Sequence, residues 1–153
     1  MSGNIAIGIQ DFSTIIQGNY FYIDKTPFIK EWWDCGDSAT LITRPRRFGK
    51  TLTMSMVEQF FSIDYAGRSD LFEHLAIWKE EKYRELQGTY PVISLSFARI
   101  KERDYEKTKQ KMCEVLRNIY IKFCYIKDSE KLTDADRAYY AVSYTHLRAH
   151  ETE

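Results

Sequence analysis

The chain has 153 residues, of which 44% are hydrophobic, and its 22 Lys and Arg residues balance 22 Asp and Glu residues. This length and composition predict one soluble globular domain or part of one, and the balanced charge gives no sign of a nucleic-acid-binding protein. No apolar run of membrane-spanning length and no secretory leader is visible, which argues against a membrane protein and predicts a cytoplasmic location. Cys35, Cys113 and Cys124 lack metal-ligand spacing, so we expect free thiols.

A short helix and a short strand are expected first. Asp11 can cap the helix, and Gly18 ends it. Its apolar residues are Phe12, Ile15 and Ile16. The run Tyr-Phe-Tyr-Ile at residues 20–23 predicts the strand.

A second helix is expected to begin at Pro27, at the first helical position, where its missing N–H is not needed. Asp24 and Lys25 precede the predicted cap, Thr26, and read as a turn and a helix start. Gly36 is the expected end of the helix. One apolar face is formed by Phe28, Ile29, Trp32 and Trp33.

The run RPRRFGKT at residues 44–51 is the most informative motif of the chain. It meets three of the four defined positions of the phosphate-loop pattern G-x-x-x-x-G-K-[ST], with Arg44 where the pattern has glycine. In such loops, backbone N–H groups wrap phosphates, a lysine adds a point charge, and a Ser or Thr hydroxyl reaches magnesium. Gly49, Lys50 and Thr51 fit these roles, so Thr51 is the expected metal ligand.

The flanking segments predict a strand, a phosphate loop and a helix. Residues 39–43 are apolar and β-branched, as expected of a buried parallel strand. Downstream, apolar residues recur at helical spacing, namely Leu52, Met56, Val57, Phe60 and Phe61. The alternative interpretation is a basic turn between a strand and a helix that binds nothing.

The remaining pattern predicts an α/β fold. Residues 70–72 and 77–78 indicate short connecting helices or turns, and residues 91–97 indicate a second core strand. Asp104 can cap a long helix. Its apolar stripe, expected to be core, is Tyr105, Thr108, Met112, Val115, Leu116, Ile119 and Phe123. Strands alternating with helices predict a single domain with a parallel sheet flanked by helices.

The last twelve residues are expected to be foreign to the protein. Residues 142–152 can be back-translated into a sequence that resembles a transposase-type sequencing adapter read in frame. We therefore expect residues 1–141 to be the N-terminal part of a domain, residues 142–153 to be a non-native tail, and the natural chain to continue beyond Ala141. A source genome that encodes the tail continuously with what precedes it would contradict this hypothesis.

Several blocks of the chain resemble the bacterial AAA-ATPase-like family. They lie at residues 7–9, 11–12, 22–26, 41–51, 90–93 and 96–97. The resemblance covers nearly everything before Val142 and implies a P-loop NTPase-like fold, truncated here at its C-terminus, that binds ATP and Mg²⁺. It implies that Arg44 is a family trait. It also implies that Asp24 and Lys25 are important, although a turn and a helix start explain these two residues as well. It also implies a nuclease-like domain further downstream in several members, through which a nucleic acid would be reached.

Phosphate binding is assigned to the loop and the residues beside it. The assigned residues are Gly49, Lys50 and Thr51, with backbone N–H groups from Phe48 and Leu52. Arg44, Arg46 and Arg47 have three interpretations: phosphate contacts, a sensor for a partner's phosphate, or solvated charge. We expect a phosphate contact from at least one of them, because a guanidinium can bind phosphate through two parallel hydrogen bonds.

The sequence leaves the catalytic carboxylate unassigned. The predicted strand at residues 91–97 has no carboxylate at its end, and Glu102 and Asp104 read as helix-start residues. ATP hydrolysis on a P-loop fold requires such a group. We therefore expect ATP binding but no hydrolysis from these residues alone.

Two functions remain open at this point. The first is an ATP-binding module of an ATPase, which predicts magnesium-dependent nucleotide binding. The second is a non-enzymatic module whose basic loop binds an anionic partner such as nucleic acid, which predicts salt-dependent binding without nucleotide selectivity. The oligomeric state is not indicated by the sequence.

Overall fold

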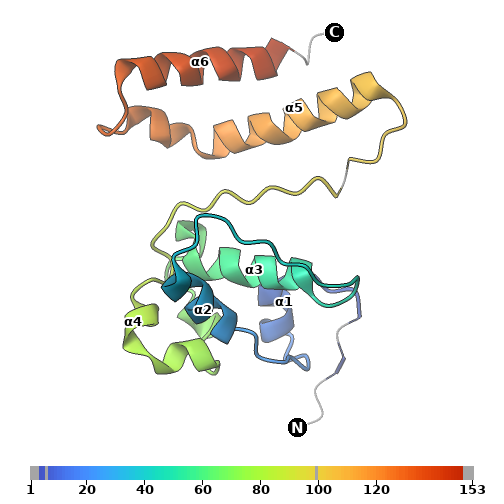
Figure 1. The fold of residues 1–153 in the computed structure, drawn as a ribbon, viewed down its shortest axis with the longest axis vertical. Coiled ribbons are helices and arrows are strands. Elements are labelled where there is room, and N and C mark those ends of the chain that lie inside the picture. Colours follow the sequence, from blue (N-terminus) through green and yellow to red (C-terminus); the bar gives the residue numbers. More distant parts are fainter. Residues whose placement is uncertain (1–3, 6, 99, 150–153) are drawn as a thin grey trace. The chain divides into compact units, whose positions relative to one another are not determined.

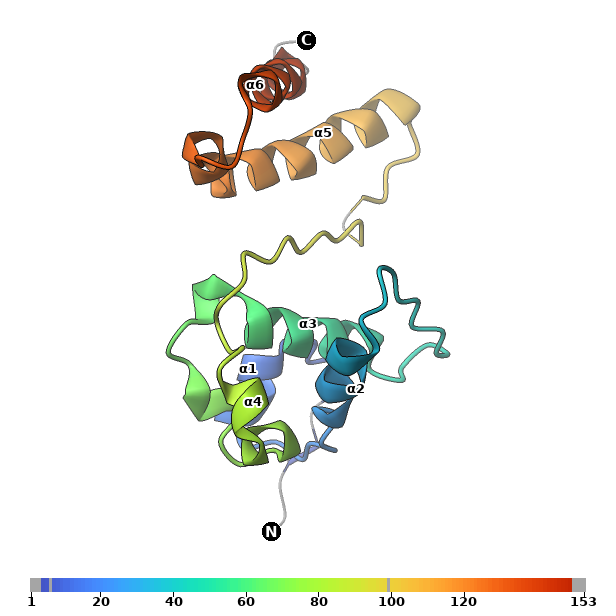
Figure 2. The same ribbon diagram turned by 60° about the vertical axis from the view of Figure 1, so that its left-hand side comes forward.

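The computed structural model describes residues 4–5, 7–98 and 100–149. It divides into two compact units, Met1–Val92 and Ile93–Glu153. The first unit contains α1 (Phe12–Gln17), α2 (Pro27–Cys35), α3 (Lys50–Phe61), three 3₁₀ helices (Ile63–Tyr65, Ser69–Leu71 and Ala76–Lys79) and α4 (Glu81–Arg84). The second contains α5 (Tyr105–Lys122), a 3₁₀ helix (Cys124–Asp128) and α6 (Asp134–Ala149). Figures 1 and 2 show α1 and α2 lying beside α3 within the first unit.

The predicted helix boundaries are confirmed where a local capping signal set them. The α2 helix begins at Pro27 and ends before Gly36, whose φ of 66° is the left-handed conformation that glycine adopts without strain. The Asp104 side chain accepts a hydrogen bond from the Lys107 N–H at 3.0 Å and so caps α5. The Thr26 side chain precedes Pro27 as predicted, but it makes no capping hydrogen bond to α2.

The Asp11 carboxylate caps α1 and joins it to α3. One of its oxygens accepts a hydrogen bond from the Thr14 N–H at 2.8 Å, and the other accepts one from the Gln59 amide at 2.6 Å. Burial raises the pKa of Asp11, but the hydrogen bonds from Ser13, Thr14 and Gln59 outweigh it and hold this pKa below the ordinary value of 3.8. The folded state therefore favours the ionised carboxylate.

Replacing Asp11 by alanine is expected to lower the free energy of unfolding by about 1–2 kcal/mol at neutral pH, because the cap and the bond to α3 are both lost. Since the folded pKa is depressed, the contribution of Asp11 is complete above the unfolded pKa and disappears as the pH falls through the folded one. Urea denaturation at pH 7 and pH 3 measures both effects. Asp37→Ala, at an exposed position, is the matched control. Equal stability of the two variants at pH 7 would contradict the expectation.

The core of the first unit is formed by side chains from α1, α2, α3 and the short helices that follow. Its buried members are Phe12, Ile29, Met56, Phe60, Phe61, Leu71, Phe72, Ile77 and Tyr83. Phe60 lies edge-on to both Phe61 and Phe72, with ring centroids 5.0 Å and 5.1 Å apart. Met56, Phe60 and Phe61 of the predicted apolar face of α3 are core, and Leu52 and Val57 pack against it. The predicted short helices or turns at residues 70–72 and 77–78 fall at the 3₁₀ helices Ser69–Leu71 and Ala76–Lys79.

The predicted P-loop NTPase-like α/β fold, with its parallel sheet flanked by helices, is wrong, because the described residues form helices and no sheet. In the described part of the chain, β pairing is limited to an isolated parallel bridge between Ser62 and Tyr90. The segments at residues 20–23, 39–43 and 91–97, which were expected to be strands, form neither strand nor helix. Leu41 is 84% exposed, so the segment before the loop is not the buried strand that its composition suggested. A strand forms only where another segment supplies backbone hydrogen bonds, and apolar β-branched composition does not supply that partner.

The second unit is a pair of helices, α5 and α6, that lie side by side (Figures 1 and 2). The Tyr140 hydroxyl of α6 donates a hydrogen bond to the Tyr120 carbonyl of α5 at 2.6 Å. The predicted apolar stripe of α5 is core only at its end, where Phe123 is buried, whereas Tyr105 is 75% exposed. Residues 142–149 of the predicted tail belong to α6, and residues 150–153 lie outside the described residues.

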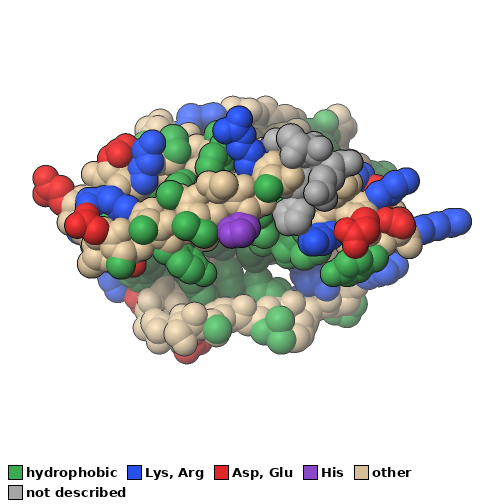
Figure 3. Space-filling view, turned by 90° about the horizontal axis from the view of Figure 1, so that it is seen from above, with side chains coloured by type: hydrophobic (Ala, Val, Ile, Leu, Met, Phe, Trp, Pro, Cys, Tyr) green, Lys and Arg blue, Asp and Glu red, His purple; other side chains and the backbone are tan. Residues whose placement is uncertain are grey.

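The surface carries charges of both signs. On the face drawn in Figure 3, Lys and Arg side chains lie interspersed with Asp and Glu, with hydrophobic side chains between them. Within the described ranges, no helix has both the length and the apolar character needed to cross a membrane. Cys35, Cys113 and Cys124 carry free thiols.

Candidate functional site

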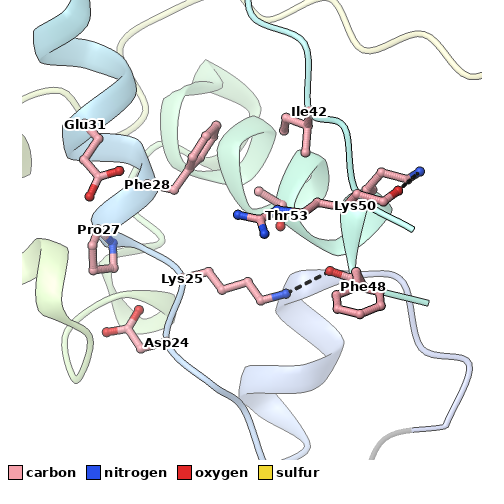
Figure 4. Close-up of a pocket in the computed structure, with 10 residues that line it drawn as sticks. Asp24, Lys25, Pro27, Phe28, Glu31, Ile42, Phe48, Lys50 and Thr53 are labelled. Atoms are coloured by element: carbon pink, nitrogen blue, oxygen red, sulfur yellow. Dashed lines mark hydrogen bonds between the residues drawn. The ribbon is translucent and has the colours of Figure 1, made fainter. Parts of the chain in front are cut away.

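A pocket of about 440 Å³ in the first unit lies between the start of α2, the loop at residues 44–49 and the start of α3. Its lining residues are Asp24, Lys25, Pro27, Phe28, Glu31, Ile42, Arg44, Phe48, Lys50 and Thr53. Figure 4 shows the side chain of Lys25 reaching from the segment before α2 to the loop. The pocket therefore combines apolar walls with three cationic side chains and two carboxylates.

The loop at residues 44–49 is turned by two residues in the left-handed conformation. Gly49, which precedes the first residue of α3, has φ 72°, and Arg47 has φ 69°. The second value is uncommon for a residue with a side chain and costs free energy that the surrounding structure must offset. The turn at Gly49 directs the chain into α3 immediately before Lys50.

The start of α3 offers unpaired backbone donors. The first helical bond to the cap runs from the Thr53 N–H to the Gly49 carbonyl at 2.8 Å. The N–H groups of Lys50, Thr51 and Leu52 come before it in the helix and have no intrahelical acceptor, as in any first turn. Together with the helix dipole, such donors favour an anion at this end of the helix.

The Lys50 side chain joins the two ends of the loop. Its ammonium donates a hydrogen bond to the Arg44 carbonyl at 2.6 Å, so the first residue of the loop is tied to the first residue of α3. Both side chains are exposed and line the pocket. An ammonium has three donors, and this bond to a neutral carbonyl leaves two for a ligand.

The structure brings together part of the predicted site. Arg44, Phe48 and Lys50 line the pocket, and Gly49 supplies the turn between them. Other predicted residues are not among its lining side chains: Arg46, Arg47, Thr51 and Leu52. Arg46 and Arg47 are exposed in the loop, and Thr51 is exposed on the first turn of α3.

Lys25 belongs to the site, although the sequence analysis did not place it there. Its ammonium donates a hydrogen bond to the Phe48 carbonyl at 3.2 Å, across 23 positions of sequence. No local pattern around Lys25 predicts this contact. The signal that pointed to it was the resemblance over residues 22–26, which the local interpretation as a turn and helix start explained without reference to the loop.

Two carboxylates that line the pocket have different surroundings. One oxygen of Asp24 accepts hydrogen bonds from the Thr26 N–H at 2.8 Å and the Thr26 hydroxyl at 2.7 Å, and the other accepts one from the Ala76 N–H at 2.7 Å. These hydrogen bonds tie Asp24 to Thr26 and Ala76, so its carboxylate has a structural role. Glu31 projects from α2 (Figure 4).

The helix-start interpretation of Glu102 and Asp104 agrees with their contacts. Glu102 forms an ion pair with Lys111 at 2.5 Å, and Asp104 caps α5. The ion pair holds the pKa of Glu102 below its ordinary value. Neither contact gives these residues a catalytic role, so the catalytic carboxylate stays unassigned.

Comparison with known proteins identifies the family. A family model described as "Predicted AAA-ATPase" matches residues 6–152. The chain belongs to this AAA-ATPase-like family. The sequence is also 33% identical over 113 residues to a protein of Azotobacter chroococcum mcd 1 whose name is "Uncharacterized protein in vnfD 5'region". That match covers 73% of this chain but 20% of the other protein, so the chain spans about a fifth of its relative's length. No solved structure matches the chain.

Proposed function

We propose that this AAA-ATPase-like chain binds a nucleoside triphosphate, ATP with Mg²⁺, through residues 44–52 acting as a variant Walker A loop. The observation that carries the proposal is the Lys50 ammonium, tied to the Arg44 carbonyl at 2.6 Å at the start of α3, in a residue that lines a pocket of about 440 Å³. The family membership supports ATP as the nucleotide.

Each part of the loop has a role in this proposal. The N–H groups of Phe48 to Leu52 donate hydrogen bonds to the phosphate oxygens. The Lys50 ammonium replaces its hydrogen bond to the Arg44 carbonyl with one to a phosphate. The Thr51 hydroxyl is the ligand for Mg²⁺. The Arg44 guanidinium, which lines the pocket, is better placed for a phosphate contact than those of Arg46 and Arg47.

Hydrolysis of ATP is proposed only for a longer protein that contains this chain. In-line attack by water on the terminal phosphate needs a carboxylate that holds Mg²⁺ or orients the water. The described residues provide no assigned group for that step. The nucleotide-binding role of this chain does not depend on it.

A second candidate function rests on the exposure of three arginines. Arg44, Arg46 and Arg47 lie within four positions and are all exposed, so the loop can also bind an extended anion such as a nucleic-acid backbone. That function would not require a pocket. The closed loop and the pocket beside Lys50 favour the nucleotide.

Calorimetric titration of ATP, with and without Mg²⁺, into the 153-residue chain tests the proposal. We expect saturable binding of one nucleotide that is strengthened by Mg²⁺, competed by tripolyphosphate and much weaker for AMP. A folded chain that does not bind ATP would contradict the proposal. Tighter binding of a mixed-sequence oligonucleotide, with a steep dependence on salt, would instead support the second function.

A further inference from the structure

We propose that Lys25 is a second phosphate-binding lysine of this site, delivered from the segment before α2 to the far side of the loop from Lys50. The inference rests on the proposed nucleotide site and extends it to a residue outside the loop motif. It assigns to the ammonium of Lys25 a direct contact with the phosphate chain of the ligand.

The Lys25 ammonium lies at the end of the loop. It is 3.2 Å from the Phe48 carbonyl, at the bend that leads into α3, and the Lys25 side chain lines the same pocket as Lys50 (Figure 4). Lys50 contacts the beginning of the loop and Lys25 contacts its end. Two ammonium groups thus reach the loop from different parts of the chain.

The Lys25 ammonium has hydrogen-bond donors left for a ligand. Its single hydrogen bond to a neutral carbonyl uses one of three ammonium donors. No ion pair in the described part of the chain neutralises Lys25, whereas Lys30 and Lys82 are paired with Glu80 and Asp34. A cation without a carboxylate partner beside a helix start raises the local potential for an anion.

The backbone around Lys25 is held in place, so its side chain starts from a fixed point beside the loop. The Lys25 N–H donates to the Tyr22 hydroxyl at 3.3 Å, and that hydroxyl contacts the Met56 sulfur of α3 at 3.3 Å. Burial raises the pKa of Tyr22 to about 12, so the hydroxyl stays neutral. On the other side, Asp24 ties the segment to the Ala76 N–H.

Gly49 makes room for this lysine. A Cβ atom added at Gly49 would lie 2.7 Å from the Lys25 ammonium, closer than a real contact permits. The glycine is required for its left-handed φ, and a side chain at this position would make the ammonium at the end of the flexible Lys25 side chain shift. The close approach links the loop motif to Lys25.

The test is calorimetric titration of Mg-ATP and of tripolyphosphate into the wild-type chain and four variants. Lys25→Gln keeps a donor for the Phe48 carbonyl and removes the charge, and Lys25→Arg keeps the charge. Lys50→Ala tests the proposed function, and Lys79→Gln is the control at an exposed lysine outside the pocket. We expect Lys25→Gln to weaken both ligands about tenfold, as loss of one charge-assisted hydrogen bond predicts, and Lys25→Arg to restore most of the affinity.

The outcomes separate the inference from the function on which it rests. If wild type binds ATP, Lys50→Ala binds it about a hundredfold more weakly, and Lys25→Gln equals wild type, the inference is wrong and the nucleotide site stands. If wild type does not bind either ligand, both fail. If Lys25→Gln unfolds at a lower temperature, Lys25→Arg decides: retained affinity supports the phosphate contact, and lost affinity overturns it.

Discussion

Replacing Lys50 by alanine is expected to lower the affinity for Mg-ATP by about a hundredfold while leaving the fold intact. The Lys50 ammonium is the cation tied to the loop at the start of α3, and a charge-assisted hydrogen bond to phosphate contributes about 1.5–3 kcal/mol. At about 1.4 kcal/mol for each factor of ten, the upper part of that range corresponds to the expected loss. Calorimetric titration of Mg-ATP measures it.

The free energy of unfolding of Lys50→Ala must also be measured, to show that the variant is folded. The bond from Lys50 to the Arg44 carbonyl is exposed, so its loss is expected to change the free energy of unfolding by less than about 0.5 kcal/mol. Lys79→Ala, outside the pocket, should match wild type in both binding and stability. Unchanged ATP affinity in folded Lys50→Ala would remove the basis for assigning residues 44–52 as a Walker A loop.

The helix ends were predictable from the sequence because their causes are local. The carboxylates of Asp11 and Asp104 each accept a hydrogen bond from an N–H three residues later. Gly36 ends α2 because its left-handed conformation needs no other part of the chain. The apolar spacing of Met56 and Phe60 likewise predicted which face of α3 is buried.

The sheet was not predictable by the same route. Residues 39–43 and 91–97 have strand-like composition, but composition describes one segment and a sheet needs at least two. In the structure neither segment pairs in a sheet, and the Leu41 and Ile93 side chains are 84% and 59% exposed. Residues 61–63 and 90 come closest to pairing, through hydrogen bonds from the Tyr90 N–H to the Phe61 carbonyl and from the Ile63 N–H to the Tyr90 carbonyl.

The candidate site likewise contains one contact with a local cause and one that joins distant parts of the sequence. The contact of Lys50 with Arg44 spans six positions and follows from the loop motif. The contact of Lys25 with Phe48 spans 23 positions and depends on how α2 packs against α3 through the core. Local sequence patterns could therefore predict the loop but not the contact that Lys25 makes with it.

Replacing Phe60 by alanine is expected to lower the free energy of unfolding by about 3–5 kcal/mol. Its ring is fully buried and contacts both Phe61 and Phe72, so truncation leaves a cavity lined by aromatic side chains. Because typical domains are stable by only about 5–15 kcal/mol, the first unit should become marginal. Urea denaturation followed by circular dichroism measures the loss.

Phe60 also connects stability with the candidate site, because α3 carries Phe60 in the core and Lys50 at the loop. Loss of the core contact should therefore weaken ATP binding in Phe60→Ala, and excess ATP should raise its unfolding temperature by mass action. Phe21→Ala, at a ring that is 61% exposed, is the matched control and should change stability by less than about 1 kcal/mol. Equal losses from Phe60→Ala and Phe21→Ala would show that α3 does not pack through this face, and the position of the loop against α2 would then lack its support.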